Sequence, residues 1–229
     1  MSESLIVQRP AGPAPQLILL FHGVGSTPAS MLPLARRLAA EWPTAFVVCV
    51  QAPLPGDGGP GWQWFSVQGI DDANRPARVA EAMPAFLATI EHWQRESGAT
   101  PDVTALVGFS QGAIMALEAT AQPRLIAGRV VALSGRYATT PHLPPPHTTL
   151  HFVHGKTDPV IHYGYTVSAA ETLVAAGADL TADVLPNLGH GIDERVMDLL
   201  IERLRTHLPA HRWQEAMQAA RDLGEEGHC

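Results

Sequence analysis

The chain has 229 residues, of which 46% are hydrophobic and 16% are charged, with 15 basic and 22 acidic side chains. This composition supports a substantial apolar core and excludes a largely disordered chain. The formal net charge of −7 and the lack of any dense Lys/Arg run disfavour nucleic acid or an anionic membrane as the partner. We expect a single domain over residues 1–209, followed by a polar helical tail over residues 210–229.

The N-terminus, the apolar runs and the cysteines bear on the cellular location of the protein. Residues 1–4 lack the basic region and long apolar segment of a secretory signal. The longest apolar runs, at 17–21 and 45–50, are too short to cross a bilayer, so no stable membrane insertion is expected. The two cysteines, Cys49 and Cys229, do not suggest a disulfide framework. We therefore expect a cytoplasmic protein. We also expect it to be a monomer or a homodimer.

Short β-prone runs alternate with helical patterns along the whole chain. In the first half the patterns predict two strands, a helix, a buried strand, a long Gly-, Pro- and Trp-rich loop and a second helix, at residues 5–7, 17–21, 31–39, 46–50, 53–70 and 76–96. Pro84 should kink the second helix.

In the second half strands and helices continue to alternate. Strands are predicted at 103–107, 129–134, 150–153 and 180–185, and helices at 113–117, 167–176 and 193–207. This alternation predicts an α/β fold with a mostly parallel central sheet and helices on both faces. In such sheets ligands bind at the carboxyl ends of strands, so the site is expected there.

A serine lies at the turn between a β-prone run and a helix-forming run. The motif Gly108-Phe109-Ser110-Gln111-Gly112 follows the strand at 103–107. This is the setting of a nucleophile elbow, a strained turn that exposes a serine hydroxyl at the end of a strand. Glycine at both flanking positions suits such a turn, because a side chain there would clash. We predict that Ser110 is a nucleophile.

An earlier strand end has the composition of an oxyanion loop. His22-Gly23-Val24-Gly25 follows the strand at 17–21, where glycines would also serve an ordinary turn. In this architecture the oxyanion donors are the N–H after the nucleophile and one from this earlier loop. The backbone amides of Val24 and Gln111 are therefore the predicted donors.

Two later strand ends carry an acid and a histidine. Asp158 follows the strand at 150–153, and His190 lies between two glycines after the strand at 180–185. Serine, acid and then histidine is the chain order of the α/β-hydrolase scheme, unlike that of other serine hydrolases. We predict that Asp158 orients His190 and that His190 acts as the base for Ser110.

Other residues could fill these two roles. Asp179 and Asp183 lie near the last predicted strand, and Asp193 has the position of a helix cap, so each remains an alternative acid. His154 also ends a strand, but it lies four residues before the predicted acid, too close to replace His190 comfortably.

Histidines and aromatic residues elsewhere raise two further possibilities. Four histidines that cluster in sequence could suggest a metal site, but they lack a recognised ligand spacing: His147, His151, His154 and His162. We predict no metal and no organic cofactor. Trp62, Trp64 and Phe65 lie in the Gly-rich loop and could simply fill the core; we predict that they line a pocket for an apolar substrate.

Five segments together resemble the phospholipase/carboxylesterase family of small α/β-hydrolases, to which the acyl-protein thioesterases belong. They are Phe-His-Gly-Val-Gly-Ser at 21–26, Gly-Trp-Gln-Trp-Phe-Ser at 61–66, Gly-Phe-Ser-Gln-Gly-Ala at 108–113, Gly-Lys-Thr-Asp-Pro-Val at 155–160 and Gly-His-Gly at 189–191. The likeness spans about residues 5–207. It implies the α/β-hydrolase fold.

By this resemblance, the family's catalytic serine, acid and histidine fall on Ser110, Asp158 and His190, and its oxyanion amides on Val24 and Gln111. The expected activity is that of a serine carboxylesterase that cleaves esters or thioesters of small or medium acyl chains through an acyl-enzyme. The polar run at 71–75 departs from a lipid-facing loop and weakens the case for a lipidated protein as substrate. The alternatives are a dienelactone-hydrolase-like or peptidase-like enzyme of the same fold, or a binding protein without catalysis.

Overall fold

The computed structural model describes residues 3–139, 141, 143–210, 212–213 and 216–218. Its centre is a seven-stranded sheet with the order β1-β3-β2-β6-β7-β8-β9. The strands are β1 (Leu5–Gln8), β2 (Leu17–Phe21), β3 (Phe46–Val50), β6 (Thr104–Phe109), β7 (Arg129–Leu133), β8 (Thr149–Gly155) and β9 (Leu180–Leu185). β1 pairs antiparallel with β3, and the other pairings are parallel.

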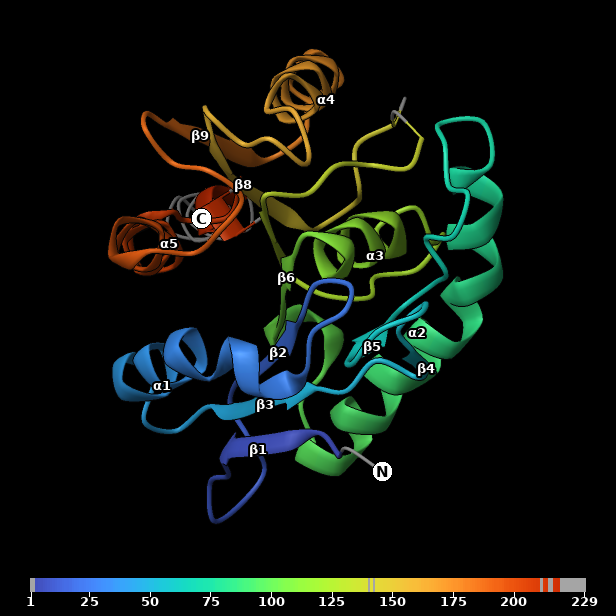
Figure 1. Ribbon diagram of the computed structural model, residues 1–229. Helices are drawn as coiled ribbons and strands as arrows, with labels where there is room; N and C mark the ends of the chain where they lie inside the picture. Colours follow the sequence, from blue (N-terminus) through green and yellow to red (C-terminus); the bar gives the residue numbers. More distant parts are fainter. Residues whose placement is uncertain (1–2, 140, 142, 211, 214–215, 219–229) are drawn as a thin grey trace, which may run out of the picture.

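Helices cover both faces of this sheet (Figure 1). They are α1 (Leu32–Glu41), α2 (Arg75–Ser97), α3 (Gln111–Ala119), α4 (Gly164–Ala175) and α5 (Glu194–Thr206), with short 3₁₀ turns at Pro28–Met31 and Pro101–Val103. Buried side chains of α2, α3 and α4 form a core on one face, and those of α1 and α5 form a second core on the other. The predicted α/β fold with a mostly parallel sheet is confirmed.

The register of the parallel strands brings the site loops together at the carboxyl end of the sheet. Phe21 is paired with Gly108, and Phe109 is paired with Leu133, so β2, β6 and β7 end at the same level. Gly155 is likewise paired with Leu185 at the ends of β8 and β9. Because parallel strands share a direction, the segments that follow these five carboxyl ends converge on one side of the molecule.

The loop at 53–70 and the end of β8 differ from their sequence prediction. The loop at 53–70 contains a short antiparallel pair, β4 (Leu54–Pro55) with β5 (Trp62–Gln63), each only two residues long. α2 is one helix of 23 residues that contains Pro84, and the kink expected there stays a prediction. β8 continues beyond the predicted end at residue 153 to Gly155, which places His154 inside the strand.

The C-terminal tail is only partly described. Residues 210, 212–213 and 216–218 are helical, and the rest of the predicted tail, 211, 214–215 and 219–229, lies outside the described residues. The division into a domain over 1–209 and a tail stays a prediction. No helix in the described part of the chain combines the length and the apolar character that crossing a bilayer requires.

Candidate active site

Ser110 occupies a strained turn between β6 and α3. Its backbone has φ 52° and ψ −114°, a conformation that costs a non-glycine residue about 1–3 kcal/mol. The neighbouring glycines are sterically required. A Cβ on Gly112 would lie 2.3 Å from the carbonyl oxygen of Phe21, and one on Gly108 would lie 2.5 Å from the backbone nitrogen of Ala113. The sequence thus builds the tight elbow that a protruding serine needs.

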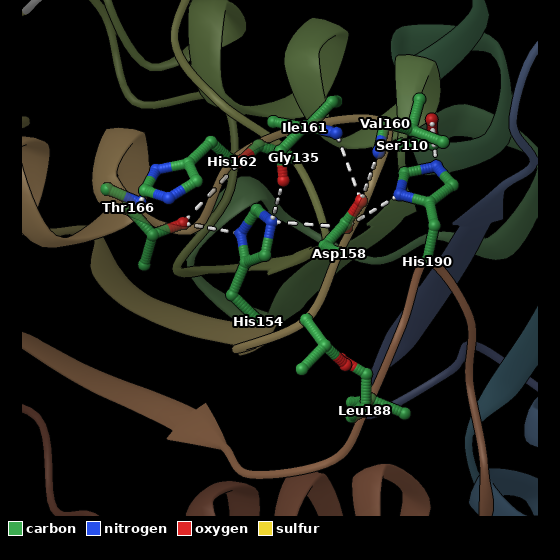
Figure 2. A network of polar contacts seen from close by, with 12 residues as sticks. Ser110, Gly135, His154, Asp158, Val160, Ile161, His162, Thr166, Leu188 and His190 are labelled. Atoms are coloured by element: carbon green, nitrogen blue, oxygen red, sulfur yellow. Dashed lines mark hydrogen bonds and ion pairs between the residues drawn. The ribbon is translucent and has the colours of Figure 1, made fainter.

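The side chains of Ser110, His190 and Asp158 lie in one hydrogen-bonded row (Figure 2). His190 Nε2 is 2.9 Å from Ser110 Oγ, and His190 Nδ1 is 2.7 Å from Asp158 Oδ2. A carboxylate only accepts hydrogen bonds, so Nδ1 carries the imidazole proton and Nε2 is left to accept from the serine hydroxyl. The serine hydroxyl thus contacts a histidine that is itself held by a carboxylate, the geometry that the sequence predicts.

Asp158 is held as a carboxylate at the start of the loop after β8. Its other oxygen, Oδ1, accepts from the backbone N–H groups of Val160 (2.8 Å) and Ile161 (3.0 Å). Burial would raise the pKa of this carboxyl group, but the hydrogen bonds from His190 and the two amides outweigh it and hold the pKa below its usual value. Asp158 is therefore ionised at neutral pH.

A second histidine contacts the same carboxylate from behind. The side chain of His154 is fully buried, and its Nε2 lies 2.8 Å from the carbonyl oxygen of Ile161 and 3.2 Å from Asp158 Oδ2. Because both neighbours are acceptors, Nε2 carries the proton; Nδ1 lies 2.8 Å from the hydroxyl of Thr166. Burial lowers the pKa of His154, so it is neutral. Figure 2 shows Asp158 between His154 and His190.

The loop after β2 is fixed by the buried side chain of His22. Its Nδ1 lies 2.8 Å from the carbonyl oxygen of Gly23, and its Nε2 accepts from the N–H of Ala52 at 3.3 Å. Burial lowers the pKa of His22, in keeping with a neutral ring that donates once and accepts once. The next residue in the loop, Val24, lines the same cleft as Ser110 and Gln111.

Gln111 joins the elbow to the aromatic loop. Its side-chain oxygen accepts from the backbone N–H of Trp64 at 2.8 Å, and its side-chain nitrogen donates to the carbonyl oxygen of Phe65 at 2.7 Å. Gln111 is buried, so both of its polar groups need partners and find them in that loop. The position of the loop is therefore coupled to that of the elbow.

The three predicted substrate-binding aromatics have different surroundings. Phe65 lines the cleft that contains Ser110. Trp64 packs in the core against Phe21 and Phe86 and donates from Nε1 to the carbonyl oxygen of His22 at 2.8 Å. Trp62 is half-buried in β5 and packs at the edge of the core. The arrangement brings Phe65 alone of the three to the serine.

The cleft at Ser110 has a volume of about 380 Å³ and a mixed lining. Apolar side chains form one part of it: Val24, Phe65, Val67, Ile70, Ile114, Val160 and Ile161. Asp72, Arg75, Arg136 and Tyr165 also line it. The sequence reasoning missed these four; the polar character of the run at 71–75 could have pointed to Asp72 and Arg75, and no signal pointed to Arg136 and Tyr165.

The alternative acids have other partners. Asp183 pairs with Arg203 (2.7 Å), Asp179 pairs with His207 (2.8 Å), and Asp193 caps α5 by accepting from its third residue. The clustered histidines are also separated by their contacts, since His151 binds Arg129 whereas His154 lies against Asp158. Among the described residues, no three His, Cys, Asp or Glu side chains are grouped to hold a metal ion.

Comparison with known proteins places this fold. The crystal structure of esterase PE8 superposes with a TM-score of 0.81 at 28% identity and covers 90% of this chain and 99% of its own. A carboxylesterase from Mesorhizobium loti shares the fold at 19% identity, with a TM-score of 0.72, over 90% of this chain and 100% of its own. The architecture is the α/β-hydrolase fold.

Sequence similarity then gives the family. Residues 2–208 match the family model described as Phospholipase/Carboxylesterase. Esterase YpfH of Escherichia coli (strain K12) is 45% identical over 96% of this chain and 94% of its own length. Acyl-protein thioesterase 1 of Saccharomyces cerevisiae (strain ATCC 204508 / S288c) is 29% identical over 69% of this chain and 77% of its own. The chain belongs to the phospholipase/carboxylesterase family, and its predicted class, a hydrolase, is confirmed.

Proposed function

We propose that this protein is a serine carboxylesterase that works through Ser110, His190 and Asp158. The observation that carries the proposal is the continuous row of hydrogen bonds from Ser110 Oγ to His190 (2.9 Å) and on to Asp158 (2.7 Å). The strained backbone of Ser110 supports it as well, because strain of this kind is typical of nucleophile elbows. The names of the relatives, an esterase and an acyl-protein thioesterase, fit the same chemistry.

The proposed reaction passes through an acyl-enzyme. His190 Nε2 takes the hydroxyl proton as Ser110 Oγ attacks the carbonyl carbon, and the ionised Asp158 stabilises the imidazolium. The backbone N–H groups of Val24 and Gln111 bind the developing oxyanion. His190 then gives the proton to the departing alcohol or thiol, and a water molecule, deprotonated by the same histidine, releases the acid and regenerates the serine.

The cleft supports esters or thioesters with small or medium acyl chains. Its apolar part, with Phe65 and Ile114, suits a hydrocarbon segment, and its volume of about 380 Å³ lies at the lower end for small-molecule sites. We place this activity in the cytoplasm. The described cysteine, Cys49, supports that location as a buried free thiol in β3.

Labelling with a fluorophosphonate probe tests the proposal directly. The probe should attach to Ser110 in the wild type, with hydrolysis of p-nitrophenyl butyrate lost in proportion to labelling, and both should vanish in Ser110→Ala. Ser134→Ala is the matched control, because Ser134 is another buried serine with positive φ (47°) after a neighbouring strand. A wild-type protein that neither labels nor hydrolyses would instead be a binding protein of this fold.

A further inference from the structure

The charged part of the cleft contains two guanidinium groups that share one carboxylate. Asp72 Oδ1 lies 3.0 Å from a terminal nitrogen of Arg136 and 3.7 Å from one of Arg75. The hydroxyl of Tyr165 lies 3.4 Å from the other oxygen of Asp72. Two positive charges against one negative charge leave an excess of one positive charge in the wall of the cleft that also holds Ser110.

Arg136 is held rigidly in this position. Its guanidinium carbon lies 3.6 Å from the centre of the Tyr165 ring, and its Nε donates to the carbonyl oxygen of Tyr137 at 3.1 Å. The side chain is 12% exposed. The preceding residue, Gly135, packs so closely that a Cβ there would lie 2.4 Å from the Cβ of Ala113 in α3. Arg136 therefore presents a fixed charge to the cleft.

Arg75 has unused hydrogen-bonding capacity. Its Nε is buried and has no hydrogen-bond partner among the described residues, although buried donors are normally satisfied. Its side chain is 19% exposed, whereas that of the shared Asp72 is 65% exposed. The cations are thus the enclosed members of the group and the carboxylate is the one that faces solvent. Arg75 also begins α2, where the helix dipole adds positive potential.

We propose that this cleft selects esters that carry an anionic group, a carboxylate or a phosphate, which Arg75 and Arg136 bind while the apolar lining holds the hydrocarbon segment. Guanidinium groups match the planar fork of a carboxylate and the oxygens of a phosphate. A ligand anion accepts from the terminal nitrogens of the two guanidinium groups and balances the excess charge. This inference names the substrate class of the proposed esterase and rests on that function.

Pairs of charged and neutral esters test the proposal on both sides of the scissile bond. For the acyl side, the p-nitrophenyl monoester of adipic acid is compared with that of its neutral monoamide. For the alcohol side, para-carboxyphenyl and para-phosphonooxyphenyl butyrate are each compared with para-carbamoylphenyl butyrate. The readout is the ratio of kcat/KM for the charged and neutral members, measured on one preparation, so that differences in active fraction cancel. The two charged butyrates also distinguish a carboxylate from a phosphate.

Arg75→Gln and Arg136→Gln should each lower this ratio about tenfold or more in at least one pair, the expected loss for a hydrogen bond to a charged group. Arg95→Gln is the matched control: Arg95 lies on the same helix, is 71% exposed, and should leave the ratio unchanged. Asp72→Asn removes the competing carboxylate and should raise the ratio. Added NaCl should lower the wild-type ratio, since salt screens such charges. Ratios that stay within twofold of the wild type in both cleft variants, for every pair, would overturn the proposal.

Calorimetric titration with adipate separates this inference from the proposed activity, because it needs no turnover. Adipate should bind the wild type and Arg95→Gln alike, and more weakly to Arg75→Gln and Arg136→Gln. A wild type that hydrolyses none of the esters, but shows this binding pattern, would refute the esterase proposal and leave the anion site standing. Neutral esters hydrolysed normally, with equal adipate binding in all variants, would refute the anion site alone.

Discussion

The carbonyl oxygen of Leu188 accepts two hydrogen bonds from Thr157, one from its backbone N–H at 3.0 Å and one from its hydroxyl at 2.9 Å. Thr157 precedes Asp158, and Leu188 lies two residues before His190. This double contact therefore fastens the loop of Asp158 to the loop of His190. Gly155 allows the close approach, since a Cβ there would lie 2.2 Å from the same oxygen.

Thr157→Val should remove the hydroxyl contact and keep the backbone one. We expect a loss of about 1 kcal/mol in the free energy of unfolding, the typical net value of one hydrogen bond, together with a lower kcat. Urea denaturation and initial rates measure the two effects. Thr89→Val, which removes a hydroxyl contact on the exposed side of α2, should lower stability without lowering kcat. Equal kcat in both variants would contradict a role of Thr157 in spacing the two loops.

Asp158→Asn should reduce kcat on the order of ten-thousand-fold while leaving the fold intact, because an amide no longer fixes the His190 tautomer or stabilises its cation. Circular dichroism checks the fold, and p-nitrophenyl butyrate the rate. Asp183→Asn serves as the control, because Asp183 pairs with Arg203 on the sheet edge. If Asp183→Asn caused the large loss instead, the assignment of the acid would be wrong.

His154 should act as a positioning residue for Asp158. Its Nε2–H contacts both the carboxylate and the carbonyl oxygen of Ile161, so it braces the turn from behind. His154→Phe removes this donor and should lower kcat ten- to a hundredfold with little change in KM, the scale of effect expected when a reacting group is misplaced. His154→Gln retains an N–H donor and should recover part of the loss. Equal rates in the two variants would show that the N–H donor of His154 does not position Asp158.

Acid should destabilise the protein through buried neutral histidines. His151 is buried in β8, with Arg129 2.9 Å from its Nε2, and burial followed by that positive charge lowers its pKa to about 3. Arg203 and His207 oppose its protonation as well, whereas Asp179 favours it. Between pH 6.5, the unfolded value, and about 3, the unfolded chain binds more protons, so stability falls as pH falls.

One such group contributes about 1.4 kcal/mol per pH unit within that window. His151→Gln should therefore flatten the decline in unfolding free energy between about pH 6 and pH 5, measured in urea at a series of pH values. The decline should persist in part, since burial also lowers the pKa of His22 and His154. A variant with the full wild-type slope would show that His151 does not couple folding to protonation.

The buried strands were the most predictable part of this fold. β2 and β3 have the predicted bounds, at Leu17–Phe21 and Phe46–Val50. Where both faces of a strand are covered, a continuous apolar run flanked by turn residues defines where the strand begins and ends. The order of serine, acid and histidine along the chain could likewise be predicted, because parallel strands present their carboxyl ends together and the chain order then names the candidates.

Contacts between distant loops could not be predicted in this way. Arg75 begins a helix and Arg136 follows a strand, and only tertiary packing places both beside Asp72. The short β4–β5 pair could not be predicted because strands of two residues, one of them containing Pro, leave no periodic signal. Trp64 and Phe65 are adjacent, similarly apolar and both buried, so composition gives no reason for Phe65 alone of the two to line the cleft that contains the serine.

Gln111 couples the position of the elbow to that of the loop at 53–70. Its side chain binds the backbone at Trp64 and Phe65, while its backbone N–H is the proposed oxyanion donor. A substitution or insertion that reshapes the loop at 53–70 therefore also displaces the proposed oxyanion donor. The amide side chain of Gln111 thus links the substrate range to kcat. Replacing this loop with that of a relative should lower kcat unless the new loop keeps both backbone contacts with Gln111.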